Sequence, residues 1–251
     1  MTKFNIHRVK WNAEKINNFW NFETSTKTNQ EDWFAFQFSG ALKNFIKLVI
    51  KKYLKSKKIN YVDYGAGKGF LLDKFVNDKN ILCSGSEFGT DALKILNSKF
   101  NNSDNYSGTI DLNNAEEIKK HEDTFDLVTM IEVIEHLTDE FYEITFKTII
   151  KLLKKNGILI ITTPNDEDLT KKEVFCPDCG CVFHRVQHVK SFNVTSISES
   201  MKKFGFESVK VEAIDLAIFK DRSIIKKFLY RIKSKFIYPK KPHLVCVVRK
   251  I

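Results

Sequence analysis

The chain has 251 residues with four prolines and ten glycines, so it can bury the core of one large α/β domain and has no linker or low-complexity segment. No apolar run approaches the roughly 18–20 residues of a membrane span and no signal peptide is apparent. The five cysteines therefore indicate free thiols in a reducing, cytoplasmic setting. The formal net charge of +10 favours anionic partners such as nucleic acid, lipid headgroups or phosphorylated small molecules.

The first 40 residues are rich in aromatic side chains and lack a clean periodicity. We interpret residues 1–40 as an N-terminal cap over a ligand cleft. Residues 41–54 follow with apolar positions at helical spacing, which predicts a helix.

A glycine-rich turn follows a short β-prone run, and residues 63–69 read DYGAGKG. A phosphate-binding P-loop would need glycine in place of Val62 and serine or threonine in place of Gly69. A dinucleotide fingerprint would need a third glycine in place of Phe70. The remaining pattern, Asp-x-Gly-x-Gly-x-Gly, resembles motif I of class I S-adenosylmethionine-dependent methyltransferases.

Strand-like and helix-like segments then alternate, which predicts a Rossmann-like, mostly parallel sheet closed by antiparallel strands. The predicted strands are 60–64, 81–87, 105–111, 125–131, 157–163, 206–213 and 244–249, and the predicted helices are 69–77, 91–100, 140–154 and 195–204. The whole chain, 1–251, is predicted to be one methyltransferase domain with two insertions. One covers 166–194 without strand or helix periodicity, and the other, 214–240, is a basic segment with helical spacing.

Later segments strengthen the resemblance, which covers roughly residues 60–165. Residues 125–137 (FDLVTMIEVIEHL) are similar to the fourth-strand motif of the family, and residues 157–165 end in Thr-Pro-Asn. The strand 81–87 ends in Glu87, at the spacing from the glycines where an acid can accept hydrogen bonds from both ribose hydroxyls of a nucleoside.

The resemblance implies a cofactor site at the carboxyl ends of the strands. Gly65 and Gly67 would pass close to the methionine part of S-adenosylmethionine, and Glu87 would bind the ribose. Asp111 or the adjacent Leu112 would contact the adenine. The same crevice would include Asp63 and Met130, whereas the simpler interpretation of Glu87 is an ordinary acid at a strand end.

The first insertion has the spacing Cys-x2-Cys-x4-His-x3-His, which is typical of a compact zinc site. The predicted ligands are Cys176, Cys179, His184 and His188, with Cys181 as a competing thiol. The alternative is a loop with incidental thiols.

A second constellation competes for the histidines. Glu132, Glu135 and His136 resemble the divalent-metal site of small-RNA 2′-O-methyltransferases, where an ion holds two vicinal hydroxyls. The same motif also occurs in family members that use no metal, where these side chains simply line the cleft.

The implied reaction is methyl transfer from S-adenosylmethionine to an acceptor that the protein aligns and deprotonates. His136 is the first choice of general base, followed by Glu132 and His188. Residues 162–165 lack the Asn/Asp-Pro-Pro-Tyr signature of nucleobase and amino-group N-methyltransferases, which favours an oxygen acceptor. Residues 176–192 also resemble bacterial methyltransferases associated with surface-polysaccharide synthesis. This suggests a sugar hydroxyl or a phosphoryl-type oxygen on a phosphorylated or nucleotide-linked glycan precursor.

Nine lysines and arginines lie between residues 220 and 241, with one acid among them. This segment is either a solvated helix face, a peripheral contact with an anionic membrane, or a phosphate footprint. The last alternative would fit an RNA 2′-O-methyltransferase, although no separate RNA-binding module is visible.

Overall fold

The computed structural model describes residues 5–25, 33–223, 226, 229–230, 232–233 and 241–251. Its centre is a seven-stranded sheet in the order β4-β3-β2-β5-β6-β10-β9. The strands are β2 (Ile59–Tyr64), β3 (Ile81–Glu87), β4 (Tyr106–Asp111), β5 (Phe125–Ile131), β6 (Leu153–Pro164), β9 (Phe206–Ile214) and β10 (His243–Lys250). The first five are mutually parallel and β10 is antiparallel to both β6 and β9, which confirms the predicted Rossmann-like class.

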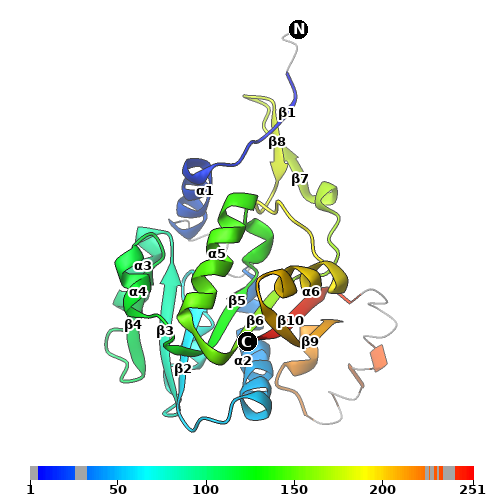
Figure 1. The fold of residues 1–251 in the computed structure, drawn as a ribbon. Coiled ribbons are helices and arrows are strands. Elements are labelled where there is room, and N and C mark those ends of the chain that lie inside the picture. Colours follow the sequence, from blue (N-terminus) through cyan, green and yellow to red (C-terminus); the bar gives the residue numbers. More distant parts are fainter. Residues whose placement is uncertain (1–4, 26–32, 224–225, 227–228, 231, 234–240) are drawn as a thin grey trace.

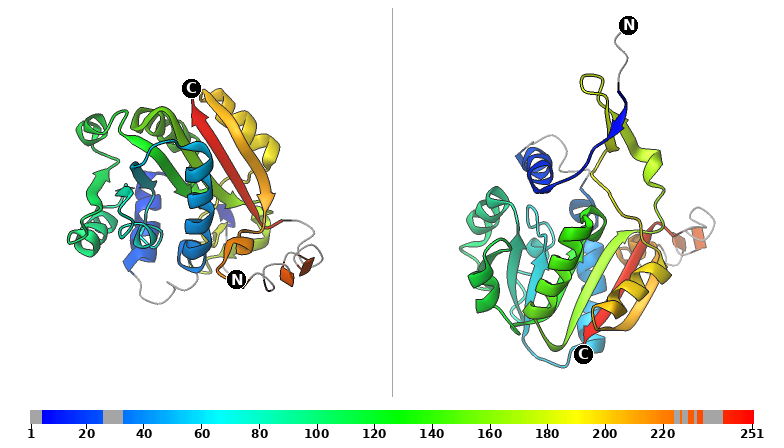
Figure 2. Two further views of the ribbon diagram at one scale, coloured as in Figure 1. Left: turned by 90° about the horizontal axis from the view of Figure 1, so that it is seen from below. Right: turned by 45° about the horizontal axis from the view of Figure 1, so that its top comes forward.

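Helices cover both faces of the sheet (Figure 2). They are α2 (Phe34–Tyr53), α3 (Thr90–Phe100), α4 (Ala115–Lys120), α5 (Asp139–Leu152) and α6 (Val194–Lys203). Adjacent strand residues point to opposite sides, so Tyr61 packs with α2 and α3 whereas Val62 packs with α5 and α6. Burial on both faces explains why the central strands are almost continuously apolar.

The predicted helix 69–77 is wrong in extent, because the structure forms only a 3₁₀ turn, η2 (Leu72–Lys74), there. Gly69 has a φ of +71°, and a Cβ at this position would lie 2.5 Å from the ring of Phe100. The chain therefore leaves the glycine turn in a left-handed conformation and is pressed against α3, which delays and shortens the helical segment.

The insertion 166–194 is not free of strands. It contains β7 (Glu173–Phe175) and β8 (Cys181–His184), preceded by a 3₁₀ turn, η4 (Leu169–Lys172). The two strands join β1 (His7–Arg8) in a separate three-stranded sheet that projects from the body (Figures 1 and 2). Strands this short carry no readable periodicity, and β1 comes from the opposite end of the chain.

The segment between the closing strands begins with η5 (Leu216–Phe219), and residues 226, 229, 230, 232 and 233 are helical. Several residues of the predicted basic segment, including Lys227, Arg231, Lys235 and Lys240, lie outside the described residues. Among the helices that the structure describes, none combines the length and apolar character needed to cross a membrane.

Candidate active site

A cleft of about 720 Å³ lies at the carboxyl ends of β2, β3 and β5, and residues of helix α1 (Ala13–Ser25) line it. Figure 1 shows α1 above this edge of the sheet. Its lining includes six of the residues predicted from the sequence: Gly65, Gly67, Glu87, Glu132, His136 and His188. The structure thus brings the glycine turn, the acid of β3 and the acid–histidine motif after β5 to one cavity.

The glycine turn has a conformation that only glycine accepts readily. Gly65 and Gly67 have φ angles of +75° and +54°. A Cβ on Gly65 would lie 2.7 Å from Val133, and one on Gly67 would lie 3.2 Å from the indole of Trp33. Side chains here would both strain the backbone and fill the space next to the cleft.

Glu87 is fixed by the turn that it faces. Its Oε1 accepts a hydrogen bond from the Gly67 amide at 2.6 Å, and its Oε2 accepts one from the Phe88 amide at 3.1 Å. Burial raises the pKa of Glu87, whereas these two hydrogen bonds lower it. Each carboxylate oxygen has more than one acceptor site, so both can still accept from a ligand hydroxyl.

Three other predicted cofactor residues do not line the cleft. Asp63 is only 4% exposed and accepts from the Thr129 hydroxyl at 2.6 Å; burial raises its pKa to about 7 despite that bond. The Met130 side chain is fully buried on the α5 face of the sheet. Asp111 is turned towards Asn113, whose side-chain amide donates to it at 3.1 Å.

Asn113 lies in the cleft lining, where the sequence analysis expected Asp111 or Leu112. Its Nδ2 also donates to the Phe88 carbonyl at 2.7 Å, which ties it to the end of β3. Leu112 is buried in the core. Of residues 111–114, Asn113 is therefore the one that lines the cleft, and the adenine contact itself stays a prediction.

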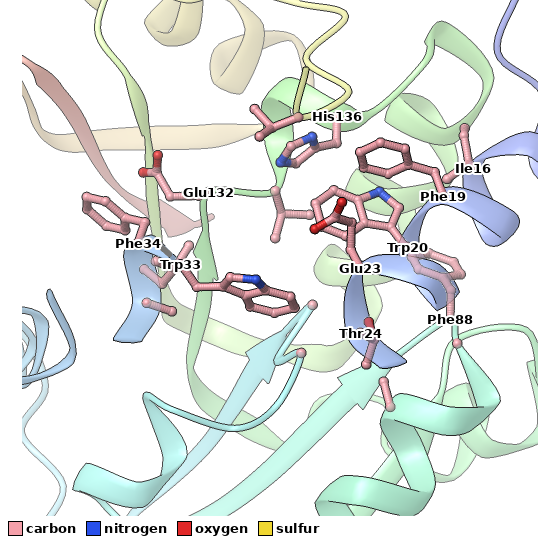
Figure 3. A pocket seen from close by; sticks show the side chains of 18 of the residues that line it. Ile16, Phe19, Trp20, Glu23, Thr24, Trp33, Phe34, Phe88, Glu132 and His136 are labelled. Carbon is pink, nitrogen blue, oxygen red and sulfur yellow. The ribbon is translucent and has the colours of Figure 1, made fainter. Parts of the chain in front are cut away.

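Helix α1 forms one wall of the cleft, with Glu132 and Phe34 on the opposite side (Figure 3). The Trp20 ring meets the His136 ring edge-on at a centroid distance of 4.8 Å. Trp20 Nε1 donates to the buried Gln187 Oε1 at 3.0 Å, and Gln187 Nε2 donates to the His136 carbonyl at 3.0 Å. Trp20 and Gln187 were not predicted as site residues. The aromatic richness of the first 40 residues was the signal for Trp20, and Gln187 belongs to the 176–192 segment that resembles other methyltransferases.

Glu132 and His136 follow β5 on a tight turn in which Glu132 has a φ of +52°. Thr162 donates its hydroxyl to Glu132 Oε1 at 2.8 Å. Burial raises the pKa of Glu132 to about 7, against this hydrogen bond. Burial, reinforced by the neighbouring His188, lowers the pKa of His136 to about 3, so its imidazole is neutral near pH 7.

Beside the cleft lies a compact group of acids and imidazoles. His188 Nδ1 pairs with Glu167, and His188 Nε2 lies 3.9 Å from Glu135 Oε1. The ligand atoms of Glu135, His136 and His188 lie within 4.8 Å of one another, as do those of Glu167, His184 and His188. Glu167 was not predicted, because it precedes the motif that drew attention to the histidines.

Several polar atoms of this group have no hydrogen-bond partner among the described residues. They are both carboxylate oxygens of Glu135, which is 1% exposed and has the Thr163 side chain near it without a well-formed hydrogen bond, and Nε2 of His184. Burial, and then the charge of Glu132, raises the pKa of Glu135 well above its usual value. Buried unsatisfied carboxylate oxygens beside imidazole nitrogens suit a divalent cation.

The predicted zinc ligands are not assembled as one set. Cys176 and Cys179 gather with Cys181, whereas His184 and His188 belong to the acid–imidazole group. The cause is β8, which runs from Cys181 to His184 and, at about 3.3 Å per residue, separates its ends by roughly 10 Å. The four predicted ligands are therefore not brought together among the described residues, and the Cys2His2 site has no support from this arrangement.

The parallel sheet with its antiparallel closing strands, the left-handed glycine turn and the acid held against it define a class I methyltransferase fold with its cofactor-type cleft. The sequence profile of a family described as a methyltransferase domain matches residues 36–211. The chain belongs to this methyltransferase family.

Solved structures show the same fold at low sequence identity. 1,6-Didemethyltoxoflavin-N1-methyltransferase from Burkholderia thailandensis has a TM-score of 0.61 and 13% identity, covering 100% of this chain and 96% of that chain. Phosphoethanolamine N-methyltransferase 2 from Haemonchus contortus has a TM-score of 0.58 and 18% identity, but the match spans 92% of this chain and only 60% of that one. A SAM-dependent methyltransferase from Archaeoglobus fulgidus has a TM-score of 0.54 and 16% identity, covering 86% and 98%. No curated protein sequence matches the chain.

Proposed function

We propose that the chain transfers a methyl group from S-adenosylmethionine to an oxygen atom of a small anionic acceptor. A sugar hydroxyl or a phosphoryl-type oxygen of a surface-glycan precursor is the acceptor we favour. One observation supports this proposal: a single cleft contains both a site suited to a nucleoside and groups suited to an anionic acceptor. Gly67 and Glu87 form the first, and His136, Lys172 and Arg185 belong to the second.

The nucleoside end fits the cofactor. The two backbone amides that donate to Glu87 hold its carboxylate in place, so ribose hydroxyls would donate to a preorganised acceptor. Asn113 lies beside Phe88 at the same end and could contact the adenine. When bound, S-adenosylmethionine supplies an activated methyl group, and the chain has to orient the acceptor and keep water out.

The opposite end suits an anion. Arg185 and Lys172 both line the cleft, and the Arg185 amide donates to the Lys172 carbonyl at 2.8 Å, so their chain segments lie together. Lys172 also pairs with Glu167 at 2.8 Å, which leaves Arg185 as the cation best placed for a phosphate.

His136 is our preferred proton acceptor. A carbonyl oxygen can only accept, so the 3.4 Å contact of His136 Nδ1 with the Gln187 carbonyl favours a proton on Nδ1, although the Glu132 carbonyl also contacts the ring. With the proton on Nδ1, the lone pair of Nε2 can accept the proton of an acceptor hydroxyl. Because burial holds the pKa of His136 at about 3 in the free protein, this role requires the bound acceptor and cofactor to change the surroundings of the ring. Glu132 and His188 line the same cleft and are the second and third choices.

A divalent metal is the second element of the proposal. The Glu135 oxygens and the His188 imidazole fit such an ion, which would lower the pKa of a nearby hydroxyl. His136 could complete the group only in place of its role as proton acceptor, because its single lone pair serves one or the other. Glu132 is engaged with Thr162, so it is the least suited member of the predicted Glu132, Glu135 and His136 set. This metal group is also the observation that favours the alternative function, RNA 2′-O-methylation.

The test is incubation with methyl-labelled cofactor and either a small-metabolite extract or RNA. We expect label in the anionic small-metabolite fraction, lost in His136→Ala and reduced in Arg185→Ala. Labelling of RNA 3′-terminal ribose that a chelator abolishes would instead support the RNA alternative. Label on nitrogen rather than oxygen would contradict the proposed acceptor chemistry.

A further inference from the structure

A three-thiol group lies away from the cleft, in the turn between β7 and β8. The sulfur atoms of Cys176, Cys179 and Cys181 lie within 4.8 Å of one another. The turn is closed by two hydrogen bonds, from the Gly180 amide to the Cys176 carbonyl and from the Cys176 amide to the Cys181 carbonyl, each 2.9 Å long. Three thiols converging from one closed turn are a typical partial zinc site that needs one more ligand.

The N-terminal strand places a histidine beside this group. β1 pairs with β8 in parallel, and His7 lies opposite Cys181. Residues in register on neighbouring strands point to the same face, so His7 and Cys181 share a face of the small sheet. His7, Cys179 and Cys181 also line one hollow of about 600 Å³.

The tautomer of His7 suits a metal ligand. Its Nδ1 lies 2.9 Å from the Asn5 carbonyl oxygen, which can only accept, so Nδ1 carries the proton in the neutral ring. The lone pair is therefore on Nε2. Metal-bound histidines commonly donate their other ring nitrogen to a backbone carbonyl in this way.

The N-terminal segment is fitted closely to the cysteine turn. Gly180 has a φ of +75°, and a Cβ there would lie 2.9 Å from the Asn5 carbonyl oxygen. The His7 amide donates to the Gly180 carbonyl at 3.2 Å, and Arg8 pairs with Glu173 of β7. Only glycine at position 180 lets the two backbones approach this closely.

We propose that Cys176, Cys179, Cys181 and His7 bind one zinc ion, which fastens the N-terminal strand to the insertion. The exposed His7 ring lies outside the compact thiol group and turns towards it when the metal binds. The three thiols bind as thiolates and release their protons. This Cys3His site is separate from the acid–imidazole group of the cleft.

The site has a structural consequence for α1. Ring contacts lead from the small sheet to the cleft through Phe183–Trp11 (6.1 Å), Trp11–Phe19 (5.7 Å), Phe19–Trp20 (5.3 Å) and Trp20–His136 (4.8 Å). Anchoring the segment before Trp11 restricts where α1 can lie. Zinc therefore stabilises the wall of the cleft without touching the reacting groups.

The test uses cobalt(II) or zinc(II) on the full chain, because thiolate–cobalt charge-transfer absorption reports only thiol-bound metal. X-ray absorption of the wild type should show three sulfur ligands and one nitrogen ligand. His7→Ala should replace the nitrogen with oxygen, weaken zinc binding by about 10- to 100-fold and speed proteolysis before α1. Zinc stoichiometry and ligand type need no methyl transfer, so this test can fail while the proposed function stands.

Two variants serve as matched controls. His121→Ala removes a histidine whose Nδ1 also contacts a backbone carbonyl, that of Glu117 at 2.8 Å, but at the C-cap of α4. Cys83→Ala removes a buried thiol of β3. Neither should change zinc binding. Two sulfur and two nitrogen ligands, unchanged ligation in His7→Ala, a disulfide within the thiol group, or no thiol-bound metal would each overturn the proposal.

Discussion

The substitution Glu87→Gln tests the nucleoside end of the cleft. The wild-type carboxylate accepts from the amides of Gly67 and Phe88 with separate oxygens, at 2.6 and 3.1 Å. Glutamine has one oxygen and one NH₂ group, so one of the two amides would face another donor. The variant also loses an anionic acceptor for the ribose. Since hydrogen bonds to a charged group contribute about 1.5–3 kcal/mol, we expect about 10- to 150-fold weaker binding of S-adenosylmethionine.

Isothermal titration calorimetry of both proteins measures this loss directly. Glu117→Gln is the matched control, because Glu117 Oε2 accepts from the Asp111 amide at 2.7 Å but does not line the cleft. The control should bind the cofactor as the wild type does. Equal affinities of Glu87→Gln and wild type would refute the assignment of Glu87 to the ribose, and weakened binding by the control would point to a general loss of structure.

Further substitutions test other parts of the account. The folded-state pKa of Asp63 is raised to about 7, so its ionisation destabilises the fold as pH rises from about 4 to 7. In urea titrations, the unfolding free energy of the wild type should fall by about 2–3 kcal/mol more than that of Asp63→Asn between about pH 5 and pH 8. The same pH dependence of unfolding free energy in both proteins would contradict this. Gly67→Ala should weaken cofactor binding in calorimetry, whereas Gly108→Ala, which also has a positive φ but has nothing within 4 Å of its Cβ position, should cost stability alone. Trp20→Phe should lower the unfolding free energy by about 1–3 kcal/mol, because it removes the donor to the buried Oε1 of Gln187. An unchanged unfolding free energy would exclude a hydrogen bond between Trp20 and Gln187. Arg185→Ala should raise KM for the anionic acceptor in steady-state kinetics without changing the affinity for the cofactor. If acceptor KM and cofactor Kd rise by the same factor, Arg185 supports the stability of the protein and not acceptor binding.

The sequence determined the sheet well because its signals are local. Glu87 ends a strand at the bounds predicted, and the apolar runs of β5 and β10 identify strands buried on both faces. The spacing of the glycines from Glu87 was sufficient to place both at one cleft. Each of these features depends on residues close together in the chain or on a repeated pattern.

The parts that sequence reasoning missed depend on contacts between distant segments. β1 pairs with β8 although most of the chain separates them, and the hydrogen bond from Trp20 to Gln187 joins residues 167 positions apart. The Cys176–His188 spacing suggested one metal site, but an extended strand separates the thiols from the histidines. Spacing alone does not tell whether the chain between two ligands folds back or runs straight.

A crystal structure of the chain with S-adenosylhomocysteine would test the central claim most directly. We predict that both ribose hydroxyls lie within hydrogen-bond distance of the Glu87 carboxylate. The sulfur should lie near the 65–67 turn and face His136 across the cleft. A nucleoside bound away from Glu87, or a sulfur facing away from His136, would contradict the account.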